Sequence, residues 1–304
     1  MAKIAVVTGS NKGIGLQVVK ELAKQLDGLV YLTSRSEELG KAALECAKAE
    51  LGSPSGQKIR YHQLDITQPA SIAAFANYLK TEHGRLDILV NNAGIAYKHD
   101  STAPFAEQAR VTNDTNYFGT KRVCEALFPL LAPGARVVAV ASRMGTIAQN
   151  RCSAPIRSAF AEAASPEDVD VLINRFIQLA QTGEHKEAGF ADTAYGMSKL
   201  ALIALTAIQA KQMQRESARP DVLINAVCPG YVNTDMTSQK GRLTTGQGAD
   251  SIVWLALLPR KDAANPNGEM VAERKIIDWR KGQTYEAVSK SFEEAFPKEA
   301  PLPL

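Results

Sequence analysis

The spacing of Tyr195 and Lys199 is the first feature of this sequence that could carry chemistry. Residues four apart on a helix share one face, so the phenol and the ammonium would lie side by side. A free phenol has a pKa of about 10, too high for ready proton exchange at neutral pH. Because a nearby ammonium favours the phenolate, we expect Lys199 to lower the pKa of Tyr195 and suit it to general acid–base catalysis.

A glycine-rich turn near the N-terminus could bind phosphate. It follows an apolar run and precedes an amphipathic helical pattern. Glycines permit a tight turn, and the start of a helix offers unpaired N–H groups and partial positive charge to a pyrophosphate. The spacing G-x-x-x-G-x-G differs from the common G-x-G-x-x-G, and an ordinary glycine-rich turn is the alternative. The predicted cofactor contacts in this turn are Gly9, Ser10, Asn11, Lys12, Gly13, Ile14 and Gly15.

The elements that must position these residues alternate regularly. Several of the apolar runs are continuous, which indicates strands buried on both faces of a parallel sheet. Helical patterns lie between them, and this alternation predicts a Rossmann-type doubly wound α/β fold of about seven strands. The predicted strands are Lys3–Thr8, Leu29–Thr33, Ile59–Asp65, Leu86–Asn91, Ala135–Ala141, Val222–Val227 and Glu269–Ala272. The predicted helices are Gly13–Leu26, Ser36–Leu51, Pro69–His83, Pro104–Leu130, Ala194–Ser217 and Gly246–Leu258.

One stretch, about residues 143–193, interrupts this alternation. Connections in such folds are usually about 2–6 residues long, so the stretch is predicted to be a helical insertion before Tyr195. Its pattern from Pro166 to Gln181 has one apolar stripe that must be buried, either on the helix of Tyr195 or on the helix Pro104–Leu130. We expect one catalytic domain over residues 1–280 and a weakly anchored tail over 281–304.

Five motifs stand in a single order along the chain. They are Thr8–Gly15, Asn91-Asn92-Ala93-Gly94, Ser142, Tyr195-x-x-x-Lys199 and Pro229-Gly230. In this order, the chain resembles the short-chain dehydrogenase/reductase family from about residue 3 to residue 280. The insertion before Tyr195 and the residues of the first two motifs make the chain similar to the monomeric carbonyl reductase branch. Because the insertion would cover the surface that most members use for assembly, the resemblance implies a monomer.

The end of the second predicted strand indicates which nicotinamide cofactor binds. In NAD-dependent Rossmann folds, an acidic residue at this point binds the ribose 2′-hydroxyl. Ser34 stands there instead, Arg35 follows, and Lys12 lies on the same side. Two cations without a carboxylate suit a 2′-phosphate, which arginine can hold with two N–H groups. The sequence therefore predicts NADP(H).

The resemblance also implies roles for individual residues. The catalytic set would be Asn116, Ser142, Tyr195 and Lys199. Ser142 would hold the substrate oxygen, Asn116 would hold a water that links Lys199 to solvent, and Lys199 would also bind the nicotinamide ribose. Further cofactor contacts would be Asp65, Ile66, Asn91, Asn92, Ala93, Gly94, Val232 and Thr234.

The implied substrate side comprises Ser142, Met144, Cys228 and Tyr231. Carbonyl reductases often have tryptophan where Tyr231 stands, so the shape of the substrate is open. Cys228 is equally well interpreted as a small buried apolar residue at the end of a strand.

Composition excludes several other classes of function. Of the 304 residues, 35 are Lys or Arg and 32 are Asp or Glu, and a net charge of +3 is too balanced for a dedicated nucleic-acid binder. The four cysteines show no C-x-x-C and the four histidines are scattered, so we expect neither a metal site nor disulfides. No apolar run approaches the ~18–20 residues of a membrane span. We expect a cytoplasmic protein without nucleic-acid or membrane partners.

The expected activity is NADPH-dependent reduction of ketones, aldehydes or quinones to alcohols by hydride transfer, with Tyr195 as general acid. The expected partner is therefore a small-molecule carbonyl substrate. Alternatives on the same scaffold are an oxidative secondary-alcohol dehydrogenase and a specialised terpenoid or alkaloid ketone reductase. A non-catalytic NADP(H)-binding sensor is a further alternative, but it could dispense with one of the four catalytic residues, and all four are present.

Overall fold

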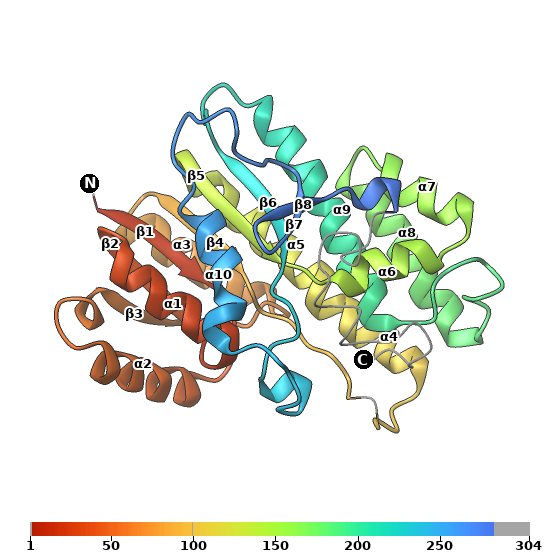
Figure 1. The fold of residues 1–304 in the computed structure, drawn as a ribbon, viewed down its shortest axis with the longest axis horizontal. Coiled ribbons are helices and arrows are strands. Elements are labelled where there is room, and N and C mark those ends of the chain that lie inside the picture. The colour runs from red at the N-terminus through yellow and green to blue at the C-terminus, as the bar shows by residue number, and fades with distance from the viewer. Residues whose placement is uncertain (1, 99, 283–304) are drawn as a thin grey trace.

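The computed structural model describes residues 2–98 and 100–282. Its strands form one sheet in the order β3-β2-β1-β4-β5-β6-β7-β8, in which β1 to β7 pair in parallel (Figure 1). This is the predicted doubly wound fold, with the reversal of strand order between β1 and β4 that creates a binding crevice. The strands are β1 Lys3–Val7, β2 Gly28–Ser34, β3 Ile59–Gln63, β4 Leu86–Asn91, β5 Leu131–Val140, β6 Leu223–Cys228, β7 Met270–Ala272 and β8 Lys275–Ile277.

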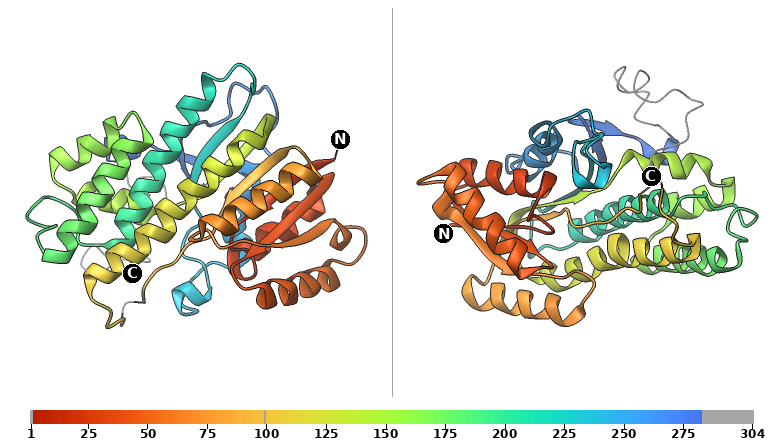
Figure 2. Two further views of the ribbon diagram at one scale, coloured as in Figure 1. Left: turned by 180° about the vertical axis from the view of Figure 1, so that it is seen from behind. Right: turned by 90° about the horizontal axis from the view of Figure 1, so that it is seen from below.

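Helices cover both faces of the sheet, because neighbouring residues of each strand point to opposite sides. Val7 belongs to the core under α1, α2 and α10, whereas Val6 belongs to the core under α3, α5 and α9. Figure 2 shows the second of these layers from behind. The helices are α1 Gly13–Gln25, α2 Glu37–Leu51, α3 Pro69–Glu82, α4 Phe105–Asn113, α5 Thr120–Leu127, α6 Arg143–Arg151, α7 Ala154–Glu162, α8 Pro166–Thr182, α9 Ala194–Gln214 and α10 Thr245–Ala256. None of the helices in the described ranges is long and apolar enough to cross a membrane.

The eighth strand was not predicted. β8 pairs antiparallel with β7 through a two-residue turn at Glu273 and Arg274, which have φ values of 50° and 59°. Two-residue hairpin turns with positive φ values usually contain Asn-Gly or Asp-Gly, which makes them recognisable in a sequence. Because neither residue of this turn is glycine or asparagine, the hairpin could not be predicted from the sequence.

The prediction of a single continuous α-helix over Pro104–Leu130 is wrong for the middle of that range. Between α4 and α5 the chain forms a π-helical segment, η2, over Asp114–Gly119. A π-helical turn contains an extra residue and is often found at functional sites. Here it holds Asn116. Strand β5 also begins four residues before the predicted start, because Pro133 and Gly134 resemble a turn in the sequence but lie within the strand.

The insertion contains three helices, of which only α8 was predicted. Ser165 and Asp168 form a reciprocal capping box at its start, and Gly183 ends it with a left-handed φ of 80°. The shorter α6 and α7 carry too few turns for a periodic pattern to stand out. All three lie at one end of the molecule beside α9 (Figure 1).

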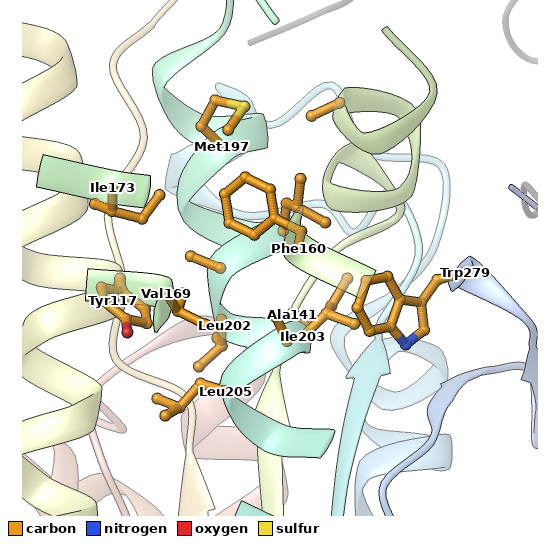
Figure 3. Packing of buried hydrophobic residues seen from close by; sticks show 14 of the residues in the cluster. Tyr117, Ala141, Phe160, Val169, Ile173, Met197, Leu202, Ile203, Leu205 and Trp279 are labelled. Atoms are coloured by element: carbon orange, nitrogen blue, oxygen red, sulfur yellow. The ribbon is translucent and has the colours of Figure 1, made fainter. Parts of the chain in front are cut away.

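The apolar stripe of α8 is buried against α4 and α9, the two surfaces expected to receive it. Figure 3 shows Val169 and Ile173 beside Tyr117, with side chains of α9 behind them. Polar contacts fix the same junction, because the Tyr117 hydroxyl donates to Asp170 Oδ1 at 2.8 Å and Lys121 pairs with the other oxygen. The predicted tail lies outside the described residues beyond Gly282.

Candidate active site

Two glycines allow α6 and α9 to approach closely. A Cβ atom on Gly145 would lie 2.8 Å from the backbone nitrogen of Leu200, and one on Gly196 would lie 3.0 Å from the Cβ of Ala148. Distances this short leave no room for a side chain at Gly145. The contact therefore brings the first turns of the two helices together.

The candidate catalytic hydroxyls lie at those first turns. Ser142 caps α6, since its Oγ accepts a hydrogen bond from the backbone N–H of Met144 at 3.1 Å. Thr193 caps α9 in the same way, by accepting from Gly196 N–H at 3.1 Å. Tyr195 lies within that turn, and its hydroxyl is hydrogen bonded to Ser142. The structure thus brings together two residues that are 53 positions apart in the sequence.

Desolvation sets the proton affinity of Tyr195, which is half-buried. Desolvation raises the pKa of the phenol well above its ordinary value, the nearby Cys228 raises it further, and the hydrogen bond from Ser142 opposes them. The expectation that Lys199 lowers this pKa is wrong for this structure, because the pKa is raised and desolvation is its largest cause. A protonated Tyr195 is the form that a general acid needs.

Lys199 is held by the main chain. Its side chain is buried, its Nζ donates to the carbonyl oxygen of Val140 at 2.7 Å, and it lies 5.5 Å from the centre of the Tyr195 ring. Burial disfavours the ammonium and lowers the pKa of Lys199 to about 8. The lysine is therefore poised to change its charge within the range in which an enzyme is assayed.

Asn116 fastens the catalytic helix to the loop after β4. Its Oδ1 accepts from Ile95 N–H at 2.8 Å, and its Nδ2 donates to the Ile95 oxygen at 2.9 Å and to Ser198 Oγ at 3.0 Å. Ser198 in turn donates to the backbone oxygen of Tyr195 at 2.8 Å. Both amide hydrogens of Asn116 are thus engaged, and its implied role in holding a water stays a prediction.

Ser198 was missed by the sequence analysis. The residue is completely buried between Asn116 and the catalytic pair. The available signal was its place directly before Lys199, where a polar residue must face a partner if the helix is buried.

The glycine-rich turn has the geometry of a cradle. Gly9 and Gly13 both have φ of 57°, a conformation that favours glycine. A Cβ atom on Gly9 would lie 2.8 Å from the Cα of Ala93, and one on Gly15 would overlap the Asn92 amide. The start of α1 lacks a side-chain cap, which leaves its N–H groups available to an anion. These features fit a dinucleotide pyrophosphate.

Thr8 and Asn92 tie this cradle to the end of β4. Thr8 Oγ1 accepts from the backbone N–H groups of Asn92 and Ala93, both at 3.0 Å. The Asn92 side chain donates back to the oxygens of Thr8 and Gly9, both at 2.9 Å. The neighbouring Gly94 reaches the catalytic lysine, since a Cβ atom there would lie 3.5 Å from Lys199 Nζ. The predicted phosphate and ribose sites are therefore continuous.

The cations expected to select the cofactor lie at the surface. Ser34 is buried and donates to the Ser36 oxygen at 2.6 Å, so no carboxylate faces a ribose there. Arg35 is exposed and forms no ion pair within the described part of the chain. Lys12 is exposed as well, but its Nζ lies 2.7 Å from Asp235 Oδ2. Asp235 was not among the expected site residues.

Some expected cofactor residues use their side chains elsewhere. Ser10 donates to the Val7 oxygen at 2.8 Å, Asn91 donates to Cys124 Sγ at 3.3 Å, and Ile66 is packed in the core. These residues can meet a cofactor only through their backbone. Asp65 differs, since only its Oδ1 is engaged, by Thr67, among the described residues. Asn11 and Ile14 are half-buried in the turn.

The segment after β6 closes the site from the other side. Val232 is buried and bridges to Leu243, while the Thr234 methyl would lie 3.4 Å from a Cβ atom on Gly13. This contact places Thr234, one of the two predicted carboxamide contacts, beside the glycine-rich turn. Of the expected substrate contacts, Met144 and Cys228 are buried and Tyr231 is half-buried.

A family model described as short chain dehydrogenase matches residues 3–154 and 181–243. The chain belongs to the short-chain dehydrogenase family. The match passes over residues 155–180, which contain most of α7 and α8, so the insertion predicted from connection length is a departure from the general pattern of this family.

Relatives within the short-chain dehydrogenase family span nearly the whole chain. "Carbonyl reductase [NADPH] 1" of Bos taurus is 42% identical over 277 residues, which cover 91% of this chain and 98% of that protein. "Carbonyl reductase [NADPH] 3" of Rattus norvegicus is 41% identical over 279 residues, covering 91% and 99%.

Solved structures agree with this assignment. Salutaridine reductase from Papaver somniferum has a TM-score of 0.78 and 30% identity, covering 88% of this chain and 99% of its own. Menthone neomenthol reductase from Mentha piperita has a TM-score of 0.76 and 32% identity, covering 90% and 100%.

Proposed function

We propose that this protein reduces ketones, aldehydes or quinones to alcohols with NADPH. The observation that carries the proposal is the half-buried Tyr195, whose hydroxyl is hydrogen bonded to Ser142 and whose ring lies 5.5 Å from Lys199 Nζ on the same helix face. The relatives named carbonyl reductase [NADPH] support both the reaction and the cofactor. Among the described residues, no group of metal-ligating side chains offers a competing centre.

The chemistry divides between cofactor and protein. NADPH, when bound, supplies the hydride. Tyr195 donates the proton to the carbonyl oxygen, and Ser142 donates a hydrogen bond that orients this oxygen and stabilises the charge it gains. Lys199 holds the nicotinamide ribose and keeps the phenol in place. Met144, Cys228 and Tyr231 are the proposed substrate contacts.

The cofactor would lie across the crevice between β1 and β4. The glycine-rich turn and the open N-terminus of α1 would bind the pyrophosphate, while Arg35 and Lys12 would bind the 2′-phosphate. Among the described residues only Oδ1 of Asp65 is engaged, so its Oδ2 would accept from the adenine amino group. Val232 and Thr234 would contact the carboxamide.

A panel of carbonyl compounds, followed by the loss of NADPH absorbance, tests this proposal. We expect turnover of several ketones, aldehydes or quinones, and weaker turnover of secondary alcohols with NADP⁺. The reverse ratio would favour an oxidative dehydrogenase. Tight NADPH binding without any turnover would favour a sensor and contradict the proposal. Terpenoid and alkaloid ketones belong in the panel, because salutaridine reductase and menthone neomenthol reductase share this fold.

We also propose a single-domain, cytoplasmic monomer. Its four cysteines are free, which suits a reducing compartment. Helix α8 covers α4 and α9 with its own apolar stripe, which removes an assembly surface from solvent. Light scattering at micromolar concentration should give a mass near 32.8 kDa. A stable mass of about four times that value would contradict the role given to α8.

A further inference from the structure

A surface loop after β6 reaches over the glycine-rich turn. We call residues 231–243 the flap. Its two ends are joined, since the Tyr231 oxygen accepts from the N–H groups of Arg242 and Leu243 at 2.9 and 3.0 Å, and Asn233 N–H donates to the Leu243 oxygen at 2.8 Å. The flap is therefore closed at its base by main-chain hydrogen bonds.

One carboxylate of the flap is aimed at the glycine-rich turn. Asp235 Oδ1 accepts from Gln239 Nε2 at 2.9 Å within the flap, and Oδ2 lies 2.7 Å from Lys12 Nζ. Lys98 contributes a second nearby positive charge. The hydrogen bond from Lys12 holds the pKa of Asp235 below its ordinary value, so the carboxylate is charged at neutral pH.

Lys12 consequently has two possible partners of the same sign. The proposed function assigns it, with Arg35, to the 2′-phosphate of NADP(H), and the present inference rests on that assignment. A phosphate monoester carries close to two negative charges at neutral pH, and Asp235 carries one. Because the two anions would compete for the same ammonium, a bound 2′-phosphate would weaken the contact between Lys12 and Asp235.

We propose that Asp235 is a specificity-determining residue for the cofactor, which holds Lys12 in the free protein and gives it up to the 2′-phosphate. Binding of NADP(H) then breaks the Lys12–Asp235 ion pair, while Val232 and Thr234 of the flap stay beside the glycine-rich turn for their proposed contact with the carboxamide. NAD(H), which has no 2′-phosphate, leaves the pair in place. The ion pair of Asp235 thus responds to the phosphate that distinguishes the two cofactors.

Adenosine 2′,5′-bisphosphate and adenosine 5′-monophosphate provide a test that requires no turnover. Asp235→Asn keeps the size of the side chain and its bond to Gln239 but removes the charge. We expect calorimetry to show three- to tenfold tighter binding of the bisphosphate to this variant and unchanged binding of the monophosphate. The control is Asp250→Asn, because Asp250 forms an ion pair with Arg274 away from the site, and it should change neither affinity.

Lys12→Met distinguishes a failure of the proposed phosphate contact of Lys12 from a failure of the proposed competition by Asp235. If this variant binds the bisphosphate as tightly as the wild type, Lys12 is not a phosphate ligand and that part of the proposed cofactor site fails. If Lys12→Met weakens binding but Asp235→Asn does not strengthen it, the cofactor site stands and the competition is wrong.

Discussion

The catalytic end and the phosphate end of the site each contain a lysine, but one lysine is buried and the other is exposed. Lys199 is only 4% exposed, and a main-chain oxygen of β5 holds its ammonium. Lys12 has a side chain that is 66% exposed and an equally exposed partner in Asp235. One lysine is placed by the fold, and the other by a contact between two surface charges.

This difference in burial determines which substitutions cost little stability and which cost much. A buried polar group needs its partners, so altering one member of the set of Asn116, Ser198 and Lys199 disturbs the others. An exposed ion pair is worth about 0–1 kcal/mol, and its loss leaves the fold intact. Cofactor preference should therefore change with surface substitutions that leave the chemistry unaltered.

The largest expected effect comes from Tyr195→Phe, which removes only the acidic hydroxyl. We expect kcat to fall by at least ~10²-fold, as befits the loss of a general acid, while the Kd for NADPH stays nearly the same. Tyr117→Phe is the matched control, because it removes a buried hydroxyl bonded to Asp170. It should cost about 1–2 kcal/mol of stability and leave kcat unchanged. Near-normal turnover by Tyr195→Phe would refute the assignment.

Arg35→Asp tests the phosphate end. The new carboxylate would repel the 2′-phosphate, so the affinity for NADPH should fall more than about tenfold, or 1.4 kcal/mol. NADH should be affected less, and the melting temperature should not change. Calorimetry that finds an unaltered NADPH affinity would place the 2′-phosphate elsewhere.

Ser198→Ala tests whether the buried contacts position the catalytic pair. The substitution leaves the Asn116 amide without one acceptor, at a cost of about 1–3 kcal/mol. We expect kcat to drop about tenfold with KM for the carbonyl unchanged. Thr206→Val is the control, since the hydroxyl of Thr206 on the same helix donates to the Leu202 oxygen at 2.7 Å, away from Asn116. An equal loss of kcat in both variants would mean that Ser198 merely stabilises α9.

The smallest effect concerns pH. Because burial lowers the pKa of Lys199 to about 8, the ammonium is present below that pH and the neutral amine above it. Tyr195 remains protonated throughout, since its pKa is raised. We expect kcat/KM for NADPH to decrease about fivefold above pH 8, as a charged hydrogen bond becomes a neutral one. Lys199→Arg should abolish this decrease, and a flat wild-type profile up to pH 10 would contradict it.

The sequence predicted the features that local patterns encode. Strands β1 to β7, the helix α8 and the order of the motifs all follow from short-range periodicity and spacing. The β7–β8 hairpin could not be predicted, because Glu273 and Arg274 adopt a left-handed turn without its usual residues. The π-helical segment at Asn116 could not be predicted either, because the side-chain partners of Asn116 there, Ile95 and Ser198, are 21 and 82 positions away.

The site likewise has features that could be predicted from the sequence and features that depend on the fold. Tyr195, Lys199 and Ser142 could be named from the sequence, and the structure brings them together. The pKa direction of Tyr195 could not, because burial is a property of the fold rather than of spacing. Asp235 was missed for a related reason, as nothing in the sequence places it opposite Lys12 across more than two hundred residues.

Helix α9, which carries Tyr195 and Lys199, is also the interior of the molecule, with seventeen of its 21 residues buried. Segments so enclosed open only when the whole domain opens. Amide protons of α9 should therefore exchange as slowly as global unfolding permits, and the catalytic centre should not melt ahead of the rest. On heating, the loss of enzymatic activity then coincides with the cooperative transition, so that a simple activity assay measures the thermal stability of the entire fold.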